Sequence, residues 1–219
     1  MPIRGLLFDF DGLIIDTETA SRAGWEWLYR QHGHELPLDL WATLIGTIGA
    51  EFDPLAHLEE LVGRPLLPEE LDAARAHEMS LIEAEELRPG IAGYLEESER
   101  LGLKRAIVSS STRRWIDTHL ERLERAVGWD AIVTADYDAE RAKPRPGLYL
   151  EALDLLGIAG GEAIAFEDSP NGVAAAKAAG IRCVAVPNGM TADLGLDQAD
   201  LVLGSLAEVS LAQLLDRFG

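Results

Sequence analysis

Residues 8–17 read FDFDGLIIDT, and the rest of the chain can be interpreted outward from this stretch. Ile3 and residues 5–8 are apolar, which is typical of a short parallel strand covered on both faces. Asp9 and Asp11 follow where this strand turns into its loop, the edge at which open α/β sheets build their sites. Two carboxylates this close repel each other unless a cation or a shared proton compensates. The pair therefore indicates either a site for a hard metal ion or an acid/base pair.

A simple turn is the alternative interpretation of the same residues. Asp and Gly are common in turns, and an Asp-Gly dipeptide by itself signals a hairpin. Three later segments, each at the end of a predicted strand, carry matching polar side chains. Together they favour a functional site over a turn.

The composition limits the classes of partner. The chain has 219 residues, enough for a large core, and a formal net charge of −19. An acidic field of this size repels nucleic acid and anionic membrane surfaces, so neither is an expected partner. We find no signal-peptide pattern and no apolar run near the roughly 18 residues of a membrane-spanning helix. We therefore expect a cytoplasmic protein, and its single cysteine, Cys183, precludes an internal disulfide.

The order of strand and helix patterns predicts the fold class. After the first strand, residues 16–88 contain only helix and loop patterns, at 16–32, 38–45, 53–63 and 68–87. Strand patterns then alternate with helices, at 106–109, 131–134, 163–166, 181–186 and 200–203, and a last helix is expected at 206–218. This alternation predicts an α/β fold with a doubly wound parallel sheet. The expected domains are a core of residues 1–15 and 89–219 and an inserted, all-helical cap of residues 16–88.

Polar residues follow three further strands of the predicted sheet. Ser109 ends one strand and offers a hydroxyl at a helix N-terminus, although a helix cap is the simpler interpretation of residues 110–112. Lys143, one of only three lysines, lies in a loop whose backbone is restricted by flanking prolines. Glu167 and Asp168 end another strand and add two carboxylates, ligands that suit Mg²⁺ together with a substrate phosphate.

In motif order this set resembles the haloacid dehalogenase superfamily, in its capped phosphatase and β-phosphoglucomutase-like branch, along essentially the whole chain. The resemblance implies a Rossmann-like core, a helical cap and Mg²⁺ as cofactor. Asp9 would be the nucleophile that forms an aspartyl-phosphate, and Asp11 would be the general acid and base. Ser109 and Lys143 would hold the phosphoryl oxygens. The implied metal ligands are Asp9, Asp11 through its carbonyl, Glu167 and Asp168.

The cap is expected to set specificity. Its candidate face includes Glu18, Arg22 and the glycine-rich residues 46–49, although Arg22 is more simply a surface charge. The candidate substrate-binding residues are Gly12, Thr17, Ser21, Ser110 and Arg113.

Departures from related branches narrow the expected activity. Dehalogenases of this superfamily lack the second acid of the first motif, which is Asp11 here. The phosphonate-cleaving branch needs a cap lysine, and no lysine precedes Lys104. β-Phosphoglucomutases carry a histidine where this chain has Ser21, and a cap lysine that is missing. We therefore expect a Mg²⁺-dependent phosphomonoester hydrolase that acts on a small phosphorylated metabolite, such as a sugar phosphate.

Two alternatives remain open at the level of the sequence. A phosphomutase would yield an isomer and not free phosphate. A non-catalytic phospho-ligand-binding protein would release no phosphate, yet it has no need of the nucleophile Asp9. The oligomeric state is not predicted.

Overall fold

The core of the molecule is a six-stranded parallel sheet. A computed structural model describes residues 2–44, 52–125 and 128–219. Hydrogen bonding orders the strands β3-β2-β1-β4-β5-β6, which places β1 at the centre with β2 and β4 on either side. The strands are β1 (Gly5–Phe8), β2 (Lys104–Ser109), β3 (Ala131–Thr134), β4 (Ala163–Glu167), β5 (Arg182–Ala185) and β6 (Leu201–Val202). The α/β fold with a doubly wound sheet is confirmed.

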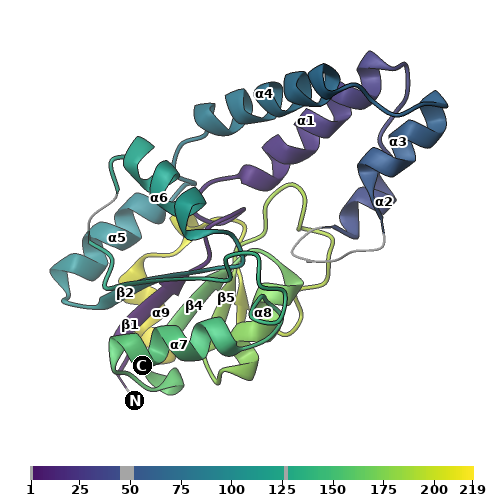
Figure 1. Ribbon diagram of the computed structural model, residues 1–219. Helices are drawn as coiled ribbons and strands as arrows, with labels where there is room; N and C mark the ends of the chain where they lie inside the picture. The colour runs from purple at the N-terminus through teal and green to yellow at the C-terminus, as the bar shows by residue number, and fades with distance from the viewer. Residues whose placement is uncertain (1, 45–51, 126–127) are drawn as a thin grey trace.

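Helices cover both faces of this sheet (Figure 1). One face packs against α5 (Ile91–Arg100), α6 (Arg113–Arg122) and α9 (Leu211–Phe218), and the other against α7 (Gly147–Leu156) and α8 (Pro170–Ala178). Successive residues of a strand point to opposite faces, so Leu7 joins the α7 and α8 side whereas Phe8 joins the other. Both faces are therefore buried, which explains why β1 is apolar throughout.

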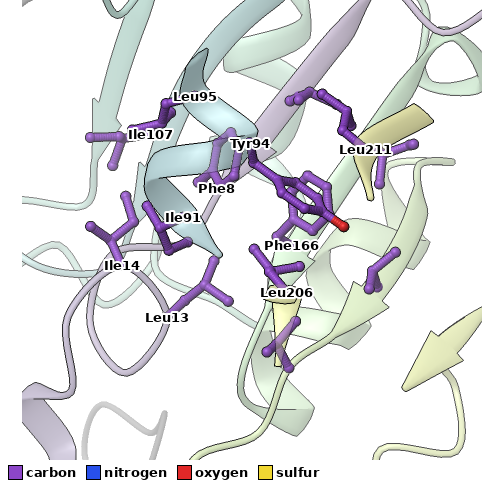
Figure 2. Close-up of a cluster of buried hydrophobic side chains, with 14 of the residues drawn as sticks. Phe8, Leu13, Ile14, Ile91, Tyr94, Leu95, Ile107, Phe166, Leu206 and Leu211 are labelled. Carbon is purple, nitrogen blue, oxygen red and sulfur yellow. The ribbon is translucent and has the colours of Figure 1, made fainter. Parts of the chain in front are cut away.

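Figure 2 shows the side that contains Phe8. Its ring stacks on Phe166 of the neighbouring strand with centroids 4.9 Å apart, and Tyr94 of α5 meets Phe166 edge-on at 5.5 Å. Leu13 and Ile14, which follow the two aspartates, pack in the same cluster near Ile91. The loop that carries Asp9 and Asp11 is thus anchored in the core immediately before and after its polar residues.

In the described residues between β1 and α5, four helices form the upper part of the molecule in Figure 1. They are α1 (Thr17–Gln31), α2 (Leu38–Ala42), α3 (Pro54–Val62) and α4 (Pro68–Ala84), and no strand interrupts them among the described residues. Their own apolar cluster contains Leu28, Tyr29, Trp41 and Leu58. We call this part the helical segment, and we keep residues 16–88 as the proposed cap. None of its described helices, nor any helix elsewhere in the described residues, is long and apolar enough to cross a membrane.

Several predicted boundaries are wrong by a few residues. The helix expected to end at Leu87 ends at Ala84, and Glu85 is extended, because the chain must there return to the core. The last predicted helix is divided into a 3₁₀ turn, Leu206–Glu208, and α9, since Ser210 caps a new helix by accepting from the amide of Gln213. The predicted helix end at Ile45 lies outside the described residues.

Both connections of the helical segment are fastened to the core. At the start of α1, Thr17 Oγ1 donates to Asp11 Oδ1 of the core loop at 2.9 Å. At the other end, the amide of Arg88 donates to Ile14 O at 2.9 Å. The Arg88 guanidinium donates to the carbonyls of Gly12, Val186 and Pro187, the last at 2.7 Å. The helical segment therefore leaves and re-enters the core beside the same loop.

Candidate active site

Three buried carboxylates meet at the carboxyl ends of the two central strands. Asp9 follows β1, Glu167 ends β4 and Asp168 comes next. Their ligand atoms all lie within 4.8 Å of one another. Because β1 and β4 pair in parallel with Phe8 opposite Phe166, the residues that follow reach the same edge of the sheet. The structure thus brings together three of the predicted metal ligands, and we call them the carboxylate cluster.

Lys143 places a buried ammonium group in this cluster. Its Nζ lies 2.5 Å from Asp9 Oδ1 and 2.6 Å from Glu167 Oε1. The amide of Lys143 also donates to Ser110 Oγ at 3.2 Å, which ties the lysine loop to the loop after β2. One cation thus faces two carboxylates, and the third carboxylate, Asp168, accepts from the side-chain amide of Asn188 at 2.9 Å.

Burial dominates the electrostatics of the cluster. It raises the pKa of Asp9 to about 8, even though Lys143 acts in the opposite direction, and Glu167 adds to the rise. Burial also raises the pKa of Asp168 well above its usual value, with Asp9 and Glu167 contributing. For Lys143, burial would lower the pKa, but Asp9 and Glu167 outweigh it and hold the pKa above the ordinary value. Three carboxylates share one lysine, so a further cation would be stabilised there in exchange for the protons that the raised pKa values retain.

Two glycines allow the loops to approach the carboxylates. Gly12 has a φ of +79°, and a Cβ on it would lie 2.2 Å from Asp168 Oδ2. Gly172 in α8 is tighter still, because a Cβ there would lie 1.7 Å from Glu167 Oε2. Gly12 therefore shapes the site through its backbone, and its predicted role in substrate binding stays a prediction.

Asp11 lies beside the carboxylate cluster and its side chain is not a member of it. Oδ1 accepts from Thr17 Oγ1 at 2.9 Å and from Trp115 Nε1 at 2.8 Å. Oδ2 accepts from Ser111 Oγ at 2.5 Å, and Ser109 Oγ lies 3.5 Å away. The interpretation of Ser111 as a helix cap is wrong, because Thr112 caps α6 and Ser111 reaches Asp11.

The remaining predicted substrate-binding residues are dispersed. Thr17 opens α1, and Ser21 lies half-buried one helical turn further along the same helix. Arg113 forms an ion pair with Asp117 at 2.9 Å on the surface of α6, and its guanidinium makes no described contact with the carboxylate cluster. Arg22 pairs with Glu26 and donates to Met190 Sδ at 3.6 Å. Residues 46–49 lie outside the described part of the chain.

Glu18 stands out among the residues proposed to face the substrate. Burial raises its pKa to about 7, and Asp11, Asp16 and Glu78 contribute to the rise. This side chain adds a further acid close to Asp11. The side of the site that Glu18 faces is therefore acidic, which favours neutral hydroxyl groups over further anionic groups on a ligand.

Sequence reasoning missed three residues that contact the predicted ones. Tyr149 donates to Glu167 Oε1 at 2.5 Å from α7, where it reads as an ordinary core residue. Trp115 reads as helix packing. Asn188 holds Asp168 and could have been found, because it follows β5 at the same edge of the sheet as the predicted residues.

The donor set fits Mg²⁺. It consists of hard carboxylate oxygens, and Glu167 Oε2 is buried with no hydrogen-bond partner among the described residues. A buried carboxylate oxygen without a donor is costly in an empty protein interior and is satisfied by a metal ion. Asp9, Glu167 and Asp168 would supply the side-chain ligands.

Comparison with known proteins agrees with this geometry. The model of haloacid dehalogenase-like hydrolases matches residues 3–180. The chain belongs to this family. YhcW of Bacillus subtilis (strain 168), which carries a provisional name as a phosphatase, is 45% identical over 215 residues, covering 98% of this chain and 97% of YhcW. Membership in the haloacid dehalogenase-like family, together with this relative, confirms the expectation of a phosphatase-type hydrolase.

Solved structures of related proteins share the fold. A Thermotoga maritima protein provisionally titled a β-phosphoglucomutase is 25% identical, with a TM-score of 0.77, covering 94% of this chain and 96% of that one. A CbbY variant from Rhodobacter sphaeroides in complex with xylulose-(1,5)bisphosphate is 27% identical, with a TM-score of 0.72, covering 97% and 99%. The family assignment therefore extends over nearly the whole chain.

Proposed function

We propose that this protein is a Mg²⁺-dependent phosphomonoesterase that acts on a small phosphorylated metabolite, such as a sugar phosphate, through an aspartyl-phosphate on Asp9. The observation that carries the proposal is the carboxylate cluster with Lys143 in contact with Asp9. A carboxylate attacks a phosphate dianion only where positive charge neutralises the repulsion between them. Lys143 supplies one such charge, and Mg²⁺ bound by the cluster would supply the other.

The roles of the protein residues follow from their positions. Asp9 attacks phosphorus, and the leaving alcohol departs on the opposite side, as in-line displacement requires. Lys143 contacts the attacking carboxylate and neutralises charge on the phosphoryl oxygens, with Ser109 as a second donor. Asp11 gives a proton to the leaving alcohol and later takes one from the water that hydrolyses the phosphoenzyme. Tyr149 and Asn188 orient Glu167 and Asp168.

The substrate class is supported by several features. A relative by structure is solved with a sugar bisphosphate. Glu18 and Ser21 on α1 could accept from and donate to sugar hydroxyl groups. The helical segment contains no lysine, so a second phosphate on the substrate would find few cations there. A monophosphate with a polyol body fits this acidic, hydroxyl-bearing surface.

Phosphate release from p-nitrophenyl phosphate, measured with Mg²⁺ and with EDTA, tests the proposal. We expect turnover only with Mg²⁺, and no turnover from Asp9→Asn, although its fold and its thermal midpoint with Mg²⁺ should resemble those of the parent protein. Substantial hydrolysis by Asp9→Asn would remove Asp9 from the nucleophile role. A panel of sugar and polyol phosphates would then identify the preferred substrate.

Phosphomutase activity is the second candidate, because a structure titled β-phosphoglucomutase shares the fold. Incubation with β-glucose 1-phosphate and a sugar bisphosphate activator distinguishes the two activities. A hydrolase yields free phosphate, whereas a mutase yields glucose 6-phosphate. We expect free phosphate, since Ser21 replaces the mutase histidine and the helical segment lacks the mutase lysine.

A further inference from the structure

Trp115 makes a contact that the proposed roles leave unexplained. Its Nε1 donates to Asp11 Oδ1 at 2.8 Å, and Thr17 Oγ1 donates to the same oxygen at 2.9 Å. Hydroxyl groups can reverse their roles as donor and acceptor, but an indole N–H can only donate. The tryptophan therefore requires that Oδ1 act as an acceptor, and it fixes which oxygen of Asp11 faces α6.

The position of the indole is set by packing. Trp115 is half-buried and packs against the apolar cluster on the Phe8 side of the sheet. His119, one helical turn later, meets the indole edge-on with ring centroids 4.2 Å apart. Both ring nitrogens of His119 are buried without a partner among the described residues. His119 thus contacts the indole by packing and not by a hydrogen bond. The packing of Trp115 against His119 and the apolar cluster therefore holds the direction of the indole N–H bond.

Three elements converge on the Asp11 carboxylate. Thr17 is the first residue of α1, Ser111 follows β2, and Trp115 belongs to α6. Together they hold the carboxylate outside the carboxylate cluster. Two of these donors come from the core, whereas Thr17 belongs to the helical segment. The orientation of Asp11 is therefore linked to the position at which α1 begins.

We propose that Trp115 is a positioning residue that orients the Asp11 carboxylate for proton transfer through its indole N–H. This inference rests on the proposed function, in which Asp11 is the acid and base of phosphoryl transfer. The indole N–H of Trp115 donates to Asp11 and not to the carboxylate cluster, so Trp115 would act only through Asp11. Its loss should therefore slow the steps that need Asp11 and spare those that do not.

The choice of leaving group distinguishes the steps that need Asp11 from those that do not. p-Nitrophenolate departs without a proton, so phosphoenzyme formation from p-nitrophenyl phosphate does not need Asp11 as an acid. Breakdown of the phosphoenzyme needs Asp11 to activate water. An alkyl phosphate needs proton transfer in both steps. A defect in the orientation of Asp11 should thus appear in the steady state and not in the p-nitrophenol burst.

The test removes the N–H group of the Trp115 indole and keeps the shape of the side chain. Benzothienylalanine, which keeps the shape of tryptophan but has no N–H, is incorporated at position 115 and, as a matched control, at position 129. Trp129 donates to the Arg125 carbonyl at 3.0 Å and packs edge-on to Phe8, without contact to Asp11. Burst rate, steady-state kcat and KM are measured with p-nitrophenyl phosphate and with an alkyl phosphate.

With p-nitrophenyl phosphate at position 115 we expect an unchanged burst rate and an unchanged kcat/KM, whereas kcat and KM fall together by roughly 10- to 100-fold, the range for losing a hydrogen bond to a charged group. With the alkyl phosphate, kcat/KM should fall as well, because both steps need Asp11. The control at position 129 should keep the parent kinetics. An unchanged kcat at position 115, or equal losses at both positions, overturns the proposal.

A second measurement covers the case in which the substituted protein does not fold. In the ¹H,¹⁵N spectrum of the unsubstituted chain, the Trp115 indole proton should move upfield in Asp11→Ala, whereas the Trp129 indole proton should not. An unmoved Trp115 signal overturns the proposal. This spectrum needs no turnover, so it distinguishes failure of the positioning contact from failure of the proposed function, which would appear as absent Mg²⁺-dependent phosphate release in the parent protein.

Discussion

Replacing Lys143 by methionine should destabilise the metal-free protein strongly. The change removes the cation that lies 2.5 Å from Asp9 and 2.6 Å from Glu167, while the length of the side chain is retained. Asp9 would lose the hydrogen bond from Lys143, and three buried carboxylates would face one another. Breaking a buried ion pair by removing one partner costs about 3–5 kcal/mol. We expect a loss of that size in the free energy of unfolding, measured by urea denaturation in EDTA.

The same measurement with Mg²⁺ should recover part of the loss, because a bound cation restores positive charge to the cluster and binds only the folded state. Lys177→Met is the matched control. Its ammonium lies 2.6 Å from Asp200, but both side chains are about one-third exposed, so the expected loss is only about 0–1 kcal/mol. If the free energy of unfolding of Lys143→Met in EDTA lies within about 1 kcal/mol of the parent value, the buried charges do not interact as we argue.

Three further predictions concern the same site. Asp11→Asn should leave the p-nitrophenol burst intact and slow phosphoenzyme breakdown by roughly 10²- to 10⁴-fold, the usual contribution of a general acid or base; an unchanged steady-state rate would refute this role. Gly172→Ala should lower the free energy of unfolding, measured in urea, by about 1–3 kcal/mol, because the new Cβ would meet Glu167 Oε2. The control, Gly93→Ala, places its Cβ in open space on α5 and should be neutral or stabilising. In EDTA the thermal midpoint should fall as the pH rises from 3.8 to about 8, since the folded protein keeps a proton on Asp9 that the unfolded chain has released; a rising midpoint over that range would contradict the raised pKa of Asp9.

The sequence was sufficient to predict the sheet and the residues at its carboxyl edge. Strand patterns are short and apolar, and parallel strands bring their ends to one edge, so Asp9, Lys143, Glu167 and Asp168 could be grouped without coordinates. The same rule, applied to β5, would have included Asn188. Helix ends were less predictable, because tertiary contacts decide them. For example, α4 stops at Ala84 so that Arg88 can reach the core.

Residues that reach the site from helices could not be identified from the pattern. Trp115 and Tyr149 both fit the apolar face of an amphipathic helix, and each has a polar tip whose direction depends on how the helix is rotated over the sheet. The sequence does not give that rotation. Arg113, which follows the serine loop, forms an ion pair with Asp117 on its own helix, and its predicted role in substrate binding stays a prediction.

The way Arg88 joins the helical segment to the sheet has an evolutionary consequence. The departing and returning chain both contact residues 11 and 12 of the core loop, through Thr17 on one side and Arg88 on the other. A change in the length or packing of α1–α4 can therefore be absorbed beyond these two points without shifting Asp9. Such an architecture would let selection rebuild the proposed cap while the proposed phosphate chemistry stays as it is. Chimaeras that exchange residues between Thr17 and Leu87 among relatives would test this.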